Sequence, residues 1–296
     1  ARRRSSHRSC VDAPSVWKVR DRAEGMTLDD MVKKLGSVGK KTSDQGDRGF
    51  MARGAKDCTE LGEMVIESIM NGNYYSCQLT KKPELIPLEN GSKCTKDLRM
   101  KMGVRRGNGT VVTLFIDPTV KLPRISTIIR DLPWHFALRD IANEESPTKI
   151  QINNINDKNS SPEPITYRKP VSECILDELE FKISGYPEAK GYLTIHKSEK
   201  PLSDSGDKRF RKSGFLVKGK RAIHECTLFS SEFEHDNLAI HYFGKIKCEY
   251  IDTLLDQYDD MREENKSYPE TNPRLLIDPN RQHGLADDHL FPSSEY

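Results

Sequence analysis

Glycines, arginines and aspartates cluster in the stretch DQGDRGFMARGAKD, residues 44–57. Its three glycines leave the backbone amides unshielded by side chains, and Arg53 and Lys56 add positive charge. The residues from about Phe50 to Leu61 fit a helix, so these amides lead into a helix N-terminus. Oriented amides, the positive end of a helix dipole and mobile cations can together hold phosphate. The alternative interpretation is a flexible, solvated surface loop, and this stretch alone does not decide between the two.

Two further segments carry groups suited to a purine base. The segment DRAEGM places Asp21 at the end of a predicted strand and Gly25 four residues later. A carboxylate at that point can accept a hydrogen bond from an exocyclic amine such as that of adenine, and a glycine lets the backbone approach a flat ring. The segment GNGTVV then places a glycine and the Thr110 hydroxyl at the start of a later strand, where they are suited to support the Asp21 carboxylate.

In order and spacing, the three segments resemble the nucleotide-binding boxes of the GHKL (Bergerat-fold) ATPases. This superfamily includes DNA gyrase B, MutL, the ninety-kilodalton heat-shock chaperones, microrchidia proteins and histidine kinases. DRAEGM resembles the D-x-G-x-G box, with Ala23 in place of its first glycine, and GTVV resembles the late G-T-x-V box. GFMARGAKD resembles the G-x-x-G-x-G box, with Ala52 in place of the middle glycine. The resemblance implies that Asp21 reads adenine in an ATP site made of Asp21, Gly25, Met26, Gly49, Ala52, Arg53, Gly54, Ala55, Lys56 and Thr110.

The second half of the chain extends this resemblance, which covers roughly residues 16–230. KSGFLVKGKRAIHECTLF is similar to the transducer segment of gyrase-, MutL- and microrchidia-type members, and most similar to the microrchidia pattern. In those relatives a ribosomal-S5-like domain sends a lysine to the terminal phosphate of ATP. Lys218 and Lys220 are both candidates here, and the alternative for each is a solvated lysine on an exposed hairpin.

The superfamily has one more box, a helix before the first strand that carries a Glu and an Asn. The Glu acts as general base and the Asn holds Mg²⁺. Residues 1–15 contain neither residue type, so ATP and Mg²⁺ are implied as cofactors while no catalytic residue and no metal ligand is identified. The chain is either a truncated copy of a longer protein or a degenerate member. In both cases we predict little or no ATP hydrolysis by residues 1–296.

Composition limits the remaining possibilities. The net charge of +2 argues against a dedicated nucleic-acid scaffold, and no apolar run approaches the length of a membrane span. Seven cysteines at scattered spacings are typical of reduced thiols, so we expect a cytoplasmic protein with no membrane contact. His224 and Cys226 lack a second pair of ligands at metal-binding spacing, which favours buried core residues over a metal site.

The predicted fold class is α+β. We expect a Bergerat-type α/β sandwich, a mixed sheet with helices on one face, over residues 1–118. A ribosomal-S5-like α+β transducer domain with a C-terminal helical tail follows over residues 119–296. The strongest local signals are a capping box at Thr27 and Asp30, which begins a helix through Leu35, and an Asn71-Gly72 turn between two strands.

Three functions follow from this combination. The leading hypothesis is an ATP-driven conformational switch whose partners are nucleotide, a second copy of the chain, and a DNA or protein client. The second is a nucleotide-binding interaction module in which ATP is only a stabilising ligand. The third is histidine-kinase-type phosphotransfer through His135, which is disfavoured because Phe136 follows it and because it lies after the nucleotide-binding boxes. A packed or capping His135 is the expected alternative.

Overall fold

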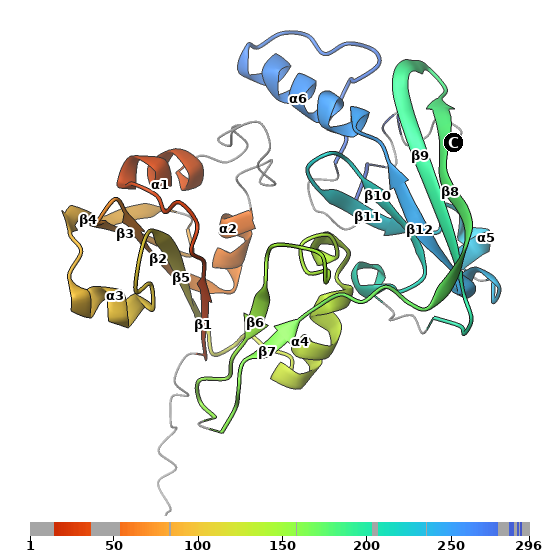
Figure 1. The fold of residues 1–296 in the computed structure, drawn as a ribbon. Coiled ribbons are helices and arrows are strands. Elements are labelled where there is room, and N and C mark those ends of the chain that lie inside the picture. Colours follow the sequence, from red (N-terminus) through yellow and green to blue (C-terminus); the bar gives the residue numbers. More distant parts are fainter. Residues whose placement is uncertain are drawn as a thin grey trace, which may run out of the picture. The chain divides into compact units, whose positions relative to one another are not determined.

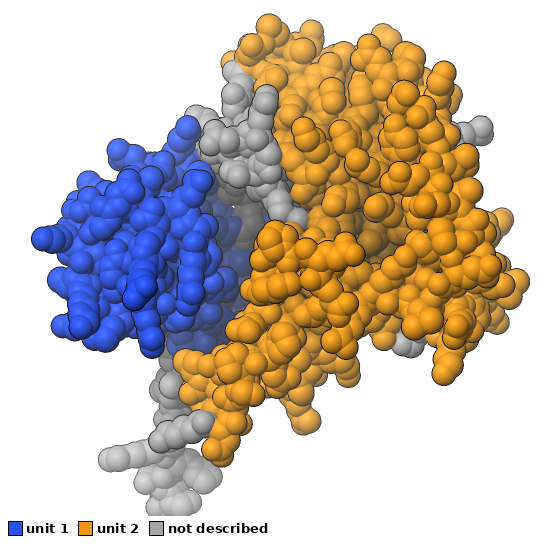
Figure 2. Space-filling view, viewed as in Figure 1, with its two compact units in different colours: residues 1–122 blue, residues 123–296 orange. Residues whose placement is uncertain are grey.

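The computed structural model describes residues 15–36, 54–82, 84–157, 159–202, 207–234, 236–277, 284–286, 289 and 291. The chain divides into two compact units, residues 1–122 and residues 123–296 (Figure 2). The helices and strands of the first unit are β1 (Ser15–Arg20), α1 (Leu28–Leu35), α2 (Gly54–Asp57), β2 (Gly62–Met70), β3 (Asn73–Leu79), β4 (Leu85–Lys93), α3 (Lys96–Met102) and β5 (Gly109–Ile116).

The first unit is built on one five-stranded sheet with the order β1-β5-β2-β3-β4, in which every neighbouring pair is antiparallel (Figure 1). Successive side chains of a strand point to opposite faces of a sheet. On β2, Ile66 packs with Met31 of α1, whereas Ile69, three residues later, packs with Met102 of α3. The two helices therefore cover opposite faces. The structure differs here from the predicted mixed sheet with helices on one face, because α3 and β4 lie in a polar segment that carried no periodic signal.

Local sequence signals determine how α1 and the β2–β3 hairpin form. Thr27 caps α1 by accepting a hydrogen bond from the Asp30 amide at 3.1 Å, and the Asp30 carboxylate accepts one from the Thr27 amide at 2.9 Å. Asn71 and Gly72 both have positive φ, of 51° and 81°, as a two-residue hairpin turn between antiparallel strands requires. The capping box and the hairpin predicted from the sequence are both confirmed.

Between β1 and α1 the chain passes very close to the sheet at Gly25. This residue has a φ of +76°, and a Cβ atom built on it would lie 2.3 Å from the Ile69 carbonyl oxygen. A side chain is therefore excluded both by the left-handed backbone conformation and by the contact with β2. Gly25 sets the distance at which the 21–26 segment crosses the end of the sheet.

The second unit contains a five-stranded sheet with the order β11-β10-β12-β9-β8, together with the two-stranded sheet β6-β7. The β10–β12 pair is parallel and the other described pairs are antiparallel. Its helices and strands are α4 (Ile125–Asp131), β6 (Ile150–Ile152), β7 (Glu163–Ile165), β8 (Ser172–Ile183), β9 (Tyr186–Ser198), β10 (Gly214–Lys218), β11 (Ile223–Thr227), α5 (Ser231–Glu234), β12 (Tyr242–Lys247) and α6 (Tyr250–Glu263). Two units of mixed helices and antiparallel or mixed sheets confirm the α+β class.

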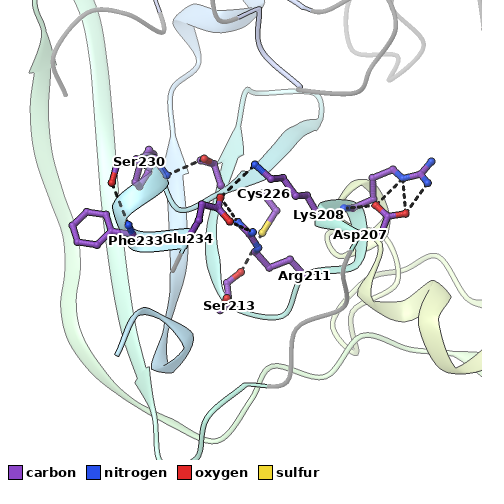
Figure 3. Close-up of polar contacts among 11 residues, drawn as sticks. Asp207, Lys208, Arg211, Ser213, Cys226, Ser230, Phe233 and Glu234 are labelled. Carbon is purple, nitrogen blue, oxygen red and sulfur yellow. Dashed lines mark hydrogen bonds and ion pairs between the residues drawn. The ribbon is translucent and has the colours of Figure 1, made fainter. Parts of the chain in front are cut away.

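A buried ion pair holds the segment that leads into β10. Arg211, which is 7% exposed, donates to the Glu234 carboxylate of α5 through both terminal nitrogens, one of them at 2.9 Å (Figure 3). Hydrogen bonds from Arg211 hold the pKa of Glu234 below its usual value. Cys226 is buried on β11, and its thiol donates to the Ser213 carbonyl oxygen at 3.4 Å. The segment that enters the β10–β11 hairpin is thus held by one contact to α5 and by another to β11.

Among the described helices, none has the length and apolar character needed to cross a membrane.

We expect the substitution Gly25→Ala to lower the free energy of unfolding by about 2 kcal/mol or more, since it adds a clash with Ile69 to the strain of a left-handed alanine. Urea denaturation followed by circular dichroism measures this change. Gly72→Ala is the matched control, because Gly72 has a φ of +81° but nothing within 4 Å of a built Cβ. It should cost only about 1 kcal/mol. Equal losses in the two variants would show that the chain does not pass tightly against Ile69.

Candidate functional site

The Asp21 carboxylate lies at the end of β1 and is held by the neighbouring strand. The Asp21 amide donates to the Thr110 carbonyl oxygen at 2.9 Å, and the Thr110 amide donates back to Asp21 Oδ1, also at 2.9 Å. The Ala23 amide adds a second hydrogen bond to the same oxygen, at 3.2 Å. Antiparallel pairing of β1 with β5 makes this possible, because the β1–β5 ladder ends at Arg20 and Val111. One carboxylate oxygen is therefore fixed by two backbone donors.

The second oxygen of this carboxylate remains as an acceptor. Within the part of the chain that the structure describes, no hydrogen bond is made to Asp21 Oδ2. The residue is exposed, so this oxygen is open to a donor from outside the chain. An ionised carboxylate only accepts hydrogen bonds, so the group selects an N–H or O–H donor.

Ser68, which was not among the predicted site residues, holds the chain after Gly25 against β2. Its hydroxyl accepts a hydrogen bond from the Met26 amide at 2.6 Å, and the residue is fully buried on β2. Met26 packs against the cluster of Leu28, Met31 and Ile66 under α1. A serine within the largely apolar sequence of β2 is the signal that could have identified this residue. The hydroxyl fixes the chain directly after Gly25.

Lys56 on α2 is a buried cation. The residue is 6% exposed, and its Nζ atom has no hydrogen-bond partner in the described part of the chain. Burial lowers the pKa of this ammonium group because desolvation disfavours its charge. Buried charges in proteins are normally paired, so an anion is the chemical complement that this site calls for.

The structure brings together only part of the predicted ATP site. Asp21, Gly25, Met26 and Thr110 meet at the end of the first sheet. Among described residues, no hydrogen bond joins Gly54, Ala55 or Lys56 to Asp21 or Thr110. Gly49, Ala52 and Arg53 lie outside the described residues.

The two candidate sensor lysines differ in their surroundings. Lys218, at the end of β10, forms an ion pair with Asp140 at 3.2 Å. Lys220 lies on the turn between β10 and β11 with an exposed side chain, and its amide donates to Asp252 Oδ2 at 2.5 Å. Of these two lysines, only Lys220 has an ammonium group that forms no ion pair with another described residue.

His135 occupies the capping role expected for it. Its Nδ1 accepts a hydrogen bond from the Ala137 amide at 3.3 Å, and its ring stacks on Phe136 at a centroid distance of 5.2 Å. Burial lowers the pKa of the imidazole. The His135 ring therefore packs against Phe136 and caps the turn that follows it.

Comparison with known proteins gives matches among solved structures. No protein-family model and no curated protein matches the chain. Among solved structures, the chain is similar to the B subunit of DNA gyrase from Myxococcus xanthus, with a TM-score of 0.45 and 10% sequence identity. This match covers 79% of the chain and 70% of the gyrase chain.

We expect the substitution Lys56→Met to raise the free energy of unfolding of the ligand-free chain by about 1 kcal/mol or more, because it removes a buried charge without a partner. The gain should depend on pH in a defined direction. Since the folded state lowers the Lys56 pKa, the unfolded chain holds the proton to higher pH, and wild-type stability rises between the lowered pKa and the usual value of 10.5. The advantage of the variant should therefore be largest below that window and shrink as pH rises through it.

Chemical denaturation at several pH values from 7 upward measures this difference, with the exposed Lys101→Met as control. A destabilised Lys56→Met chain would mean that Lys56 is paired in solution.

Proposed function

We propose that this chain is an ATP-binding protein of the GHKL type. Its first unit is the nucleotide-binding domain and its second unit is an S5-like transducer domain. The observation that carries the proposal is the Asp21 carboxylate, fixed by the Thr110 amide beside the tight passage of Gly25. Asp21 and Thr110 are 89 residues apart in the sequence and meet at this point. Both lie in segments whose side chains the sequence analysis interpreted as suited to a purine base.

The Asp21 carboxylate fits the amine edge of adenine. Adenine presents an exocyclic N–H donor, and Asp21 Oδ2 is an exposed acceptor whose partner oxygen is held in place by Thr110 and Ala23. Because Oδ1 is fixed, Oδ2 has little freedom to rotate away. A preorganised acceptor of this kind favours a base with a donor over one with a carbonyl at the same position.

Lys56 fits the anionic part of the nucleotide. Its ammonium group is buried without a partner in the described part of the chain, which is the state that a bound phosphate would relieve. In this proposal Gly54, Ala55 and Lys56 contact phosphate together with Gly49, Ala52 and Arg53. Mg²⁺ enters with the phosphates, because it binds chiefly to phosphate oxygens and water in nucleotide sites. The described residues contain no cluster of three or more His, Cys, Asp or Glu side chains suited to hold it by themselves.

Lys220, rather than Lys218, is the residue we propose to contact the terminal phosphate. Lys218 is neutralised by Asp140, whereas the Lys220 side chain extends from an exposed turn. A lysine acts on phosphate as a mobile point charge, so a side chain already held in an ion pair is the poorer candidate.

Nucleotide binding then acts in one of two ways. As a conformational switch, the protein dimerises and clamps a DNA or protein client when ATP is bound, as a cytoplasmic, microrchidia-like ATPase would. As an interaction module, it binds Mg-ATP without cleaving it. Sedimentation velocity with and without saturating Mg-ATP separates the two, because only the first predicts dimerisation when the nucleotide binds.

We expect wild-type protein to bind Mg-ATP at least about tenfold more tightly than Mg-ITP, in which a carbonyl replaces the exocyclic amine. In Asp21→Asn, the amide oxygen must still accept the Thr110 hydrogen bond, so the amide nitrogen is left to face the base. This variant should lose the preference for ATP or reverse it. Isothermal titration calorimetry with both nucleotides measures the two affinities.

Asp29→Asn is the matched control, since Asp29 is an exposed acid in the first turn of α1. It should keep the wild-type preference. An Asp21→Asn chain that still prefers ATP by the wild-type factor would rule out Asp21 as the residue that reads the base.

A further inference from the structure

The sheet of the first unit has a second face, opposite the one that carries α1 (Figure 1). Ile69 of β2 lies on this second face and packs with Met102 of α3. Because side chains alternate along a strand, Val65 and Glu67 of β2 point the same way as Ile69. Ser68 of the candidate nucleotide site points the opposite way. The second face is therefore separate from that site.

Strand pairing places the side chains of the second face in rows that cross the sheet. One row consists of Lys18, Thr113, Val65, Gln78 and Ile86. The next row, toward α3, consists of Arg20, Val111, Glu67, Ser76 and Glu89. Thr113 and Glu67 are thus diagonal neighbours on adjacent strands, and such neighbours lie about 7–8 Å apart. One small group placed between them can contact both side chains.

Glu67 is a buried acid with an incomplete set of partners. It is 8% exposed, and its Oε1 accepts a hydrogen bond from the Tyr74 hydroxyl at 3.0 Å. Burial raises the pKa of Tyr74 to about 12, so this hydroxyl keeps its proton and remains a donor at neutral pH. Among described residues, no ion pair and no second hydrogen bond reaches the Glu67 carboxylate. A buried charge is normally paired, so this carboxylate calls for a cation.

Thr113 is the second polar group of this face that lacks a partner. It is 6% exposed, and its Oγ1 has no hydrogen-bond partner in the described part of the chain. Its cross-strand neighbours are Val65 and Lys18. Lys18 is exposed on β1, an edge strand of the sheet, so its side chain is free to move away from Thr113. A donor that reaches Oγ1 relieves the cost of an unsatisfied buried hydroxyl.

An alkylammonium group supplies what both side chains lack. It carries a positive charge and three N–H donors, of which one fits the second Glu67 oxygen and another fits the Thr113 hydroxyl. A guanidinium fits less well, because its paired donors need both carboxylate oxygens and Tyr74 already holds one. The exposed Val16 and Phe115, which pair on the Thr113 side of the face, offer apolar contact to a methylene chain.

We propose that Glu67 and Thr113 form a binding site for an alkylammonium group, which comes from a lysine side chain of a partner protein or from a small aliphatic amine. Glu67 supplies the attracting charge, Tyr74 orients the carboxylate, and Thr113 accepts a second N–H. The site uses none of the residues assigned to the nucleotide, so it is independent of the proposed function.

The test is a titration of the isotopically labelled chain with n-butylammonium chloride at constant ionic strength and without nucleotide, followed by the backbone amide resonances. We expect saturable shifts at Glu67 and Thr113. Tetramethylammonium has the same charge but no N–H donor, so it should bind at least about tenfold more weakly. Equal affinities for the two cations, or the lack of a saturable shift, would overturn the proposal.

Two variants assign the binding to these residues. Glu67→Gln should weaken n-butylammonium binding by about tenfold or more, and Thr113→Val by about fivefold or more. Thr113→Val should not lower the urea concentration at the midpoint of unfolding, because Oγ1 has no partner to lose in the described part of the chain. If Glu67→Gln does not fold, Thr113→Val decides alone.

Glu60→Gln is the matched control, since Glu60 is an exposed acid of the turn Cys58–Glu60, and it should keep the wild-type affinity. A Thr113→Val chain that loses stability but keeps its affinity would show a purely structural hydroxyl and overturn the proposal.

The source of the ammonium group is decided by a second ligand, Nα-acetyl-lysine N-methylamide, which presents the same group on a peptide backbone. Tighter binding of this ligand than of n-butylammonium supports a lysine side chain of a partner protein. Equal or weaker binding supports a small amine. Binding of neither compound overturns the proposal.

Discussion

The hydrogen bond from the Thr110 amide to Asp21 Oδ1 is the contact on which the first unit's chemistry depends. It joins the end of β1 to the start of β5 and directs the free oxygen of a carboxylate outward. Gly25 and Ser68 then fix the next turn of chain against β2. An exposed aspartate without these constraints would rotate freely, whereas here its orientation is set before any ligand arrives. Preorganisation of this kind is what distinguishes a binding group from a solvated surface charge.

A second constraint on the structure is that a buried charged side chain needs a partner of opposite charge. Lys56 is buried without a partner in the described residues, while Arg211, Arg221 and Lys218 are each matched to a carboxylate. Unpaired buried charge lowers stability, so the matched pairs are the ordinary structural solution and Lys56 is the exception. In the second unit, the pairs hold the β10–β11 hairpin at its entry and at its turn, which leaves Lys220 as the exposed group on that turn.

The sequence predicted the parts of this structure that depend on local chemistry. The capping box at Thr27 and the Asn71-Gly72 turn need only neighbouring residues. For Asp21 and Thr110, the sequence pointed to a contact through the Thr110 hydroxyl, whereas the structure joins the two residues through the Thr110 backbone amide. β4, α3 and β12 were missed. β4 and α3 lie in a segment without a clear hydrophobic period, and β12 forms by pairing with β9 and β10, which are distant in the sequence. The same reason hid Ser68 and Asp252, whose roles arise from residues 42 and 32 positions away.

The most direct test of the central claim is a titration of the isotopically labelled chain with Mg-ATP, followed by the backbone amide resonances. The account predicts that the amides of Ala23 and Thr110, which donate to Asp21 Oδ1, shift strongly and together as the base binds to Oδ2. The same resonances should respond far less to inorganic triphosphate, which lacks the base. Shifts confined to other regions, or equal responses to the two compounds, would contradict the claim that a purine is held at Asp21.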